Sequence, residues 1–128
     1  MATIRQFEDI QAWKDSMVLA DAVYSASREG SFAKDFGLRD QMRRAAVSIS
    51  SNIAEGFERE SKTEFIRFLS IAKGSAGELR SQLYLAHRQG YLTDEQFNGL
   101  YAQSLSVSRK IARFSDYLRS DNTENKPS

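Results

Sequence analysis

Apolar residues recur at helical spacing along most of the chain, and this repeat favours packed helices over any sheet. In residues 37–56, Leu38, Met42, Ile49 and Ile53 follow one another at steps of four or seven, so they share one face of a helix. The only proline is Pro127, so no proline interrupts a helix earlier in the chain. We therefore expect long amphipathic helices and no strand.

Start and stop signals divide the repeat into four segments. Gly30 and Gly90 follow the first and third segments and can end them as C-terminal caps. Ser61 with Glu64 and Thr93 with Gln96 have the spacing of capping boxes, which open helices. The expected helices cover about 8–28, 38–57, 61–90 and 93–119.

These four helices predict an all-α fold, an antiparallel up-down four-helix bundle. We expect one domain over residues 1–119 and a disordered tail over 120–128. No apolar run approaches the ~20 residues that cross a bilayer, and the start lacks the apolar region of a secretory signal. With no cysteine, the composition fits a cytoplasmic protein without a membrane partner.

Catalytic and metal-binding patterns are missing from the sequence. The one histidine, His87, has Tyr84 three residues before it, so it lacks the Glu-x-x-His pair of diiron bundles. The segment AKGSAGE has neither the spacing nor the preceding strand of a phosphate-binding loop. We expect no enzyme activity, no catalytic residue, no metal, no cofactor and no small-molecule substrate. His87 then becomes a partly exposed side chain near a helix C-terminus.

Small residues on the second and third segments predict that these two helices approach each other closely. Gly74 and Gly77 each cost about 1 kcal/mol against alanine inside a helix, a cost that tight packing would offset. Polar residues accompany the small ones, and we predict that they form a hydrogen-bonded network that fixes the register of the two helices. The alternative places them in solvent on the outer face. The candidate network consists of Ser48, Asn52, Glu55, Lys73, Ser75 and Glu78.

Basic residues form two groups that are candidates for binding nucleic acid. Arg39, Arg43 and Arg44 open the second segment, whereas Arg109, Lys110 and Arg113 lie along the fourth. A row of cations on one face can bind phosphates through counterion release. The formal net charge is only +1, and neighbours such as Asp40 and Asp116 also allow an ordinary surface of ion pairs. Tyrosines and phenylalanines at helical spacing are more typical of a core than of a base-stacking platform.

Several long segments resemble one known family. QMRRAAVSISSNIAEG and IAKGSAGEL, together with FEDIQAWKDS and QGYL, are similar to the four-helix bundle proteins encoded within intervening sequences of bacterial 23S ribosomal RNA genes. The resemblance implies a homopentamer whose biochemical role is not established. It assigns fold and assembly to the family signature, which covers Arg43, Arg44, Ser48, Asn52, Glu55, Gly56, Lys73, Ser75 and Glu78.

A related group, the accessory variability proteins of diversity-generating retroelements, is pentameric and binds nucleic acid through a basic surface. This chain departs from that group in being nearly neutral. The sequence therefore supports a non-enzymatic bundle whose partner is itself. The alternative is an accessory protein that binds RNA or DNA through the basic residues of the second and fourth helices.

Overall fold

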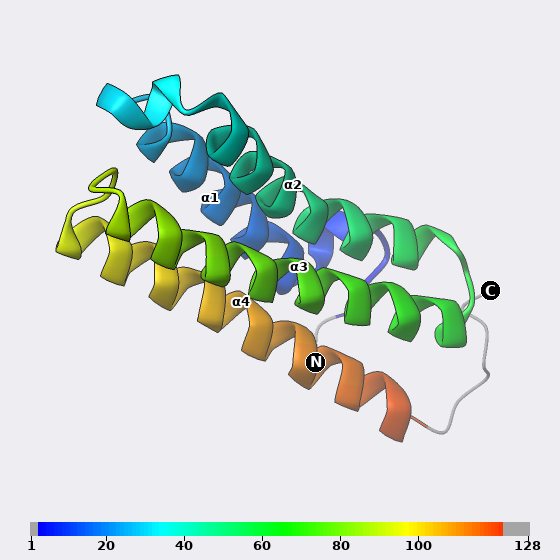
Figure 1. Cartoon of the computed structure of the whole chain (residues 1–128). Helices are drawn as coiled ribbons and strands as arrows, with labels where there is room; N and C mark the ends of the chain where they lie inside the picture. Colours follow the sequence, from blue (N-terminus) through cyan, green and yellow to red (C-terminus); the bar gives the residue numbers. More distant parts are fainter. Residues whose placement is uncertain (1–2, 122–128) are drawn as a thin grey trace.

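The computed structural model describes residues 3–121, which form four α-helices and two short 3-10 helices (Figure 1). The all-α prediction is confirmed for this part of the chain. Residues 122–128, most of the predicted tail, lie outside the described residues, and α4 extends to Ser120. The elements are η1 (Phe7–Asp9), α1 (Gln11–Ala26), η2 (Gly30–Lys34), α2 (Phe36–Glu58), α3 (Lys62–Arg88) and α4 (Asp94–Ser120).

Helix α1 begins at Gln11, later than the predicted start near residue 8. The Asp9 carboxylate accepts hydrogen bonds from the backbone N–H groups of Arg5 and Gln6, at 3.0 and 3.2 Å. These bonds close η1 as a separate turn. Ile10 follows with extended dihedrals (φ −80°, ψ 120°) and is only 2% exposed. The chain therefore anchors Ile10 in the core before the α-helix starts.

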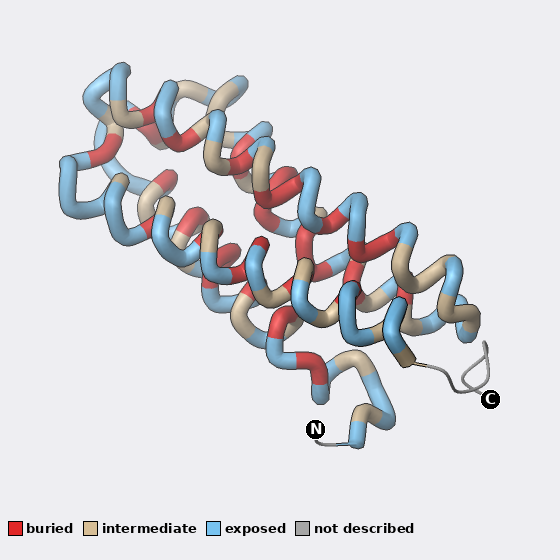
Figure 2. Tube along the Cα trace, turned by 90° about the horizontal axis from the view of Figure 1, so that it is seen from below, coloured by how far each residue is buried: buried red, intermediate tan, exposed pale blue. Residues whose placement is uncertain are grey.

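The core lies along the inner faces of all four helices (Figure 2). Helix α2 packs most extensively against α3, and the contact of α1 with α4 is the least extensive of the four neighbouring pairs. None of the helices in the described part of the chain is long and apolar enough to cross a membrane. Fully buried core side chains include Leu19, Val23, Ile49, Ile53, Leu69, Leu79, Leu83 and Ile111.

The close approach of α2 and α3 is made at Gly56. A Cβ atom at Gly56 would lie 2.7 Å from Phe68 Cβ and 3.0 Å from Phe65 Cδ1, so only glycine fits. The prediction that Gly74 makes this contact is wrong, because Gly74 is exposed and a Cβ there would meet no heavy atom within 4 Å. At Gly77 the nearest atom is the Arg80 guanidinium, at 3.7 Å.

The two glycines should respond to alanine in opposite directions. Gly56→Ala is expected to lower the free energy of unfolding by about 1–3 kcal/mol, because Phe68 Cβ is fixed to the backbone and cannot move alone. Gly74→Ala is expected to raise it by up to about 1 kcal/mol, since alanine is the better helix former and nothing obstructs it. Urea denaturation of the two variants measures both effects. Equal effects would contradict the assigned contact.

Candidate functional site

A polar contact joins α2 to α3. The hydroxyl oxygens of Ser48 and Ser75 are 2.9 Å apart, and the Asn52 amide donates to the Ser48 carbonyl at 2.8 Å and to its hydroxyl at 2.9 Å. Ser75 is buried, and the other two side chains are partly buried. The structure thus brings together three of the six residues of the candidate network.

The other three candidates lie in solvent. Glu55 is exposed and pairs with Arg59 of the same helix at 3.1 Å. Lys73 and Glu78 are exposed, and neither makes a hydrogen bond or an ion pair within residues 3–121. Lys73 is two residues from Ser75, and a step of about 200° around the helix turns it away from α2.

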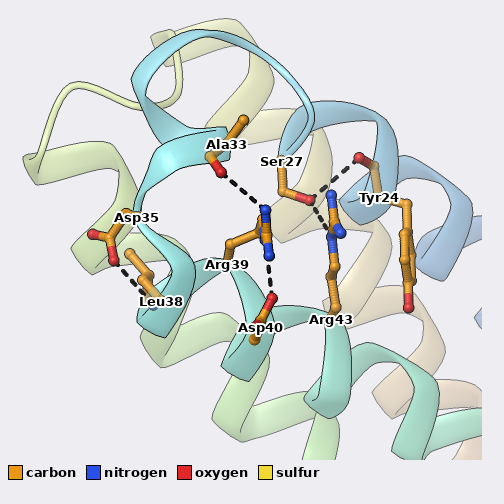
Figure 3. Close-up of polar contacts among 8 residues, drawn as sticks. All are labelled: Tyr24, Ser27, Ala33, Asp35, Leu38, Arg39, Asp40 and Arg43. Atoms are coloured by element: carbon orange, nitrogen blue, oxygen red, sulfur yellow. Dashed lines mark hydrogen bonds and ion pairs between the residues drawn. The ribbon is translucent and has the colours of Figure 1, made fainter.

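The basic residues at the start of α2 attach this helix to its neighbours (Figure 3). Arg43 donates from Nε to the Ser27 hydroxyl at 2.8 Å, and its guanidinium lies 4.6 Å from the centre of the Tyr24 ring. Arg39 binds Asp40 at 2.9 Å and donates to the Ala33 carbonyl at 3.0 Å. These guanidinium groups are therefore engaged in holding α1, η2 and α2 together.

Asp35 is a structural residue that the sequence analysis missed. One carboxylate oxygen accepts from the Leu38 N–H at 3.1 Å and caps α2, while the other accepts from the Tyr91 hydroxyl at 2.8 Å. This hydrogen bond raises the pKa of Tyr91 above its ordinary value. An aspartate just before a helix is a recognisable capping signal, but its bond to a tyrosine between α3 and α4 depends on the fold.

The basic residues of α4 differ in their partners. Lys110 forms an ion pair with Asp15 of α1. Burial favours a higher pKa for Asp15, but hydrogen bonds from Lys110 and Gln11 hold that pKa below its ordinary value. Arg109 and Arg113 are exposed and have no carboxylate partner among the described residues.

The two basic groups do not form one surface. Arg43 contacts Tyr24 near the end of α1, whereas Arg113 lies beside Ile10 at its beginning. Fourteen residues of helix correspond to about 21 Å along the axis. Arg44 is exposed on α2 and, within the described part of the chain, makes no ion pair.

A groove runs between α1 and α4, where the helix contact is least extensive. It contains three hollows with volumes of about 280, 340 and 620 Å³. Lys110 and Arg113 border the hollow at one end, and Glu29 and Glu95 border the hollow at the other. Its other lining residues are mostly apolar or small, including Ile10, Ala12, Val18, Ala22, Ala26, Gly99, Leu100, Ala102 and Val107.

Aromatic rings gather at the outer side of the α3–α4 contact. The Tyr84 ring lies 5.1 Å from Phe97 and 5.6 Å from Tyr101, measured between centroids. His87 stacks on Phe97 at 4.8 Å, and its Nε2 is 2.6 Å from Asp94. Tyr84 is 52% exposed, and a hydrogen bond with Tyr101 raises its pKa. Tyr84 therefore lies at the surface of the bundle.

No metal-binding cluster is visible in the described part of the chain. Within residues 3–121, no three acidic or histidine side chains come close enough to hold an ion. His87 is committed to Asp94 and Phe97.

The Ser48–Ser75 contact should contribute measurably to stability. Ser75→Ala is expected to lower the free energy of unfolding by about 1 kcal/mol through loss of a partly buried hydrogen bond. Glu55→Ala serves as the control and should change it by less than about 0.5 kcal/mol, because the Glu55 carboxylate is exposed. A double-mutant cycle with Ser48→Ala measures the coupling directly. Additive effects would show that the two hydroxyl groups do not interact.

Comparison with known proteins identifies a family and similar solved structures. The family model described as 23S rRNA-intervening sequence protein matches residues 8–113. A crystal structure of a protein of unknown function from the S23 ribosomal protein family of Bacteroides thetaiotaomicron is 26% identical. The alignment covers 82% of this chain and 95% of that one, with a TM-score of 0.75.

No functionally curated protein matches the chain. The family match nevertheless covers most of the residues that form the bundle, from the middle of η1 into the last third of α4. The chain belongs to the 23S rRNA-intervening sequence protein family.

Proposed function

We propose that this protein is a non-enzymatic, antiparallel up-down bundle that assembles with copies of itself through the α1–α4 groove. The observation that carries the proposal is the groove itself, an apolar surface that runs along one side of the bundle. Val18, which lines it, is 56% exposed. Exposed apolar side chains gathered along one side of a molecule are a feature of many protein contacts.

The charges of the groove favour a second copy as its occupant. Cations border one end of the groove and carboxylates border the other, and the nearly neutral chain carries 18 basic and 17 acidic residues, so a different face of the next copy can place unlike charges opposite both ends. Small residues such as Gly99 and Ala102 leave room for a helix to approach, and a Cβ at Gly99 would meet no heavy atom within 4 Å.

The antiparallel arrangement and the number of subunits rest on different arguments. Only three residues, 59–61, separate α2 from α3, and five, 89–93, separate α3 from α4. Connections this short join antiparallel neighbours in bundles.

The family resemblance supports five subunits. A groove that receives a different face of the next copy makes a heterologous contact, which is the kind of contact that a closed ring of five requires.

Light scattering after size exclusion tests the assembly. We expect a mass of five times the 14.5 kDa chain for the natural protein and a fall towards 14.5 kDa for Gly99→Leu, whose side chain fills the groove. Gly74→Leu is a matched control, because it places the same side chain at an equally open helical glycine on α3. A monomeric natural protein, or equal loss of mass in both variants, would contradict the proposal.

Nucleic-acid binding is the second candidate function, and Arg109 with Arg113 carries it. The two guanidinium groups are one helical turn apart on α4, and the described residues offer them no carboxylate. The arginines near the start of α2 add little to this surface, because Arg39 and Arg43 are engaged in contacts of their own.

Replacing both arginines tests this candidate. Arg109→Gln with Arg113→Gln should weaken binding to a structured RNA and reduce the slope of log affinity against log salt by about 2, one unit for each lost phosphate contact. Fluorescence anisotropy at two or more salt concentrations measures the slope. An unchanged slope would exclude these arginines from any phosphate contact.

A further inference from the structure

The side chain of Tyr84 is about half exposed on the outer side of α3 and α4. The ring planes of Phe97 and Tyr101 are tilted by 56° and 72° to it, so neither neighbour stacks on it. With 52% of the residue exposed, an aromatic surface remains open while packing against Phe97 and Tyr101 fixes its position.

Arg80, one turn before Tyr84 on α3, carries a charge that no carboxylate in the described part of the chain balances. Its Nη1 donates to the Ser104 carbonyl at 3.4 Å and to the hydroxyls of Ser104 and Ser108 at 3.3 and 3.0 Å. All three acceptors are neutral, so they orient the guanidinium without cancelling its charge. The missing side chain of Gly77 leaves space beside Nη2.

Two more cations follow the same side of α3. Lys73 precedes Arg80 by two helical turns and Arg88 follows Tyr84 by about one, and both are exposed. Asp94 also reaches this region, where it binds His87. The α3–α4 aromatic face, as we define it, consists of Lys73, Arg80, Tyr84, Arg88, Phe97 and Tyr101.

We infer that the α3–α4 aromatic face binds single-stranded nucleic acid, with a base stacked on Tyr84 and phosphates beside Arg80 and Arg88. Arg80 and Arg88 lie about 6 Å before and after Tyr84 along the helix axis. Single-strand binding needs an aromatic ring on which a base stacks and cations along the path of the phosphates, and this face supplies both. Paired bases in a duplex hide their faces, so a single strand fits better.

This inference goes beyond self-assembly and uses a different surface from Arg109 and Arg113. A two-fold contact between copies at this face is unfavourable, because it would bring the cations of both copies together. An acidic protein shares the charge of a nucleic acid but lacks its flat bases, and the experiment separates the two through the ring of Tyr84.

The test is titration of a fluorescent 20-nucleotide oligouridylate at 50 and 200 mM salt, followed by anisotropy. We expect salt-sensitive binding by the natural protein and at least fivefold weaker binding by Tyr84→Ala, the effect of losing one stacked base. Tyr84→Phe keeps the ring and should retain affinity. Arg80→Gln should weaken binding and lower the salt slope by about 0.7.

Tyr117→Ala is the matched control, since Tyr117 is 44% exposed on α4, where its ring stacks with Phe114. Its affinity should equal that of the natural protein. Absence of salt-sensitive binding, or equal weakening by Tyr84→Ala and Tyr117→Ala, would overturn the inference.

Light scattering of Tyr84→Ala and Arg80→Gln separates the inference from the proposed functions. A drop in mass would make this face a subunit contact and overturn the inference. An unchanged mass with weaker oligouridylate binding supports it. If only the Arg109 and Arg113 substitutions weaken binding, the second candidate function stands and the inference fails.

Discussion

The close contact between α2 and α3 is the constraint on which the rest of the structure depends. Gly56 removes the side chain where α2 meets Phe65 and Phe68, and Ala72 and Ala76 of α3 are fully buried. Small residues allow the two backbones to approach, but they also permit neighbouring registers. The bond between Ser48 and Ser75 supplies a directional contact that only one register satisfies.

The bundle is closed on its other side by the contact between α1 and α4, and α1 is the shorter of these two helices. Helix α1 has 16 residues against 27 in α4, so it covers only part of the helix beside it. The Asp15–Lys110 pair connects α1 and α4, and hollows lie on both sides of it. The groove is therefore a consequence of the limited contact between α1 and α4 and of the small side chains that line it, rather than of one missing residue.

The sequence predicted what depends on local chemistry. The capping box of Thr93 and Gln96 forms as expected, and Ile49 and Ile53 are fully buried, because turns and apolar periodicity are encoded within a few residues. Composition alone could not predict whether Gly74 faces the core or solvent. It lies two residues from the buried Ala72, and only the helix's rotation about its axis decides which of them faces the core.

Tyr84 and the α1–α4 groove required the fold for a related reason. Helical spacing places Tyr84 near apolar residues, but its exposure depends on how α4 lies against α3. The groove needs two segments that are about 80 residues apart in sequence, and no local pattern records how far apart their axes lie. The partners of charged side chains also depend on the fold. Arg43 donates a hydrogen bond to Ser27, whereas Asp40, three residues before it, pairs with Arg39.

The residues that carry the family resemblance are mainly those that build the scaffold. Ser48, Asn52, Gly56 and Ser75 join α2 to α3. The groove and the α3–α4 aromatic face use mostly other residues, such as Val18, Gly99, Arg80 and Tyr84. The exceptions are Lys73 on the aromatic face and, in the groove, the residues of the similar segment FEDIQAWKDS, such as Ala12 and Asp15. A match to the signature therefore specifies the α2–α3 frame but leaves most side chains of the two proposed contact surfaces unspecified.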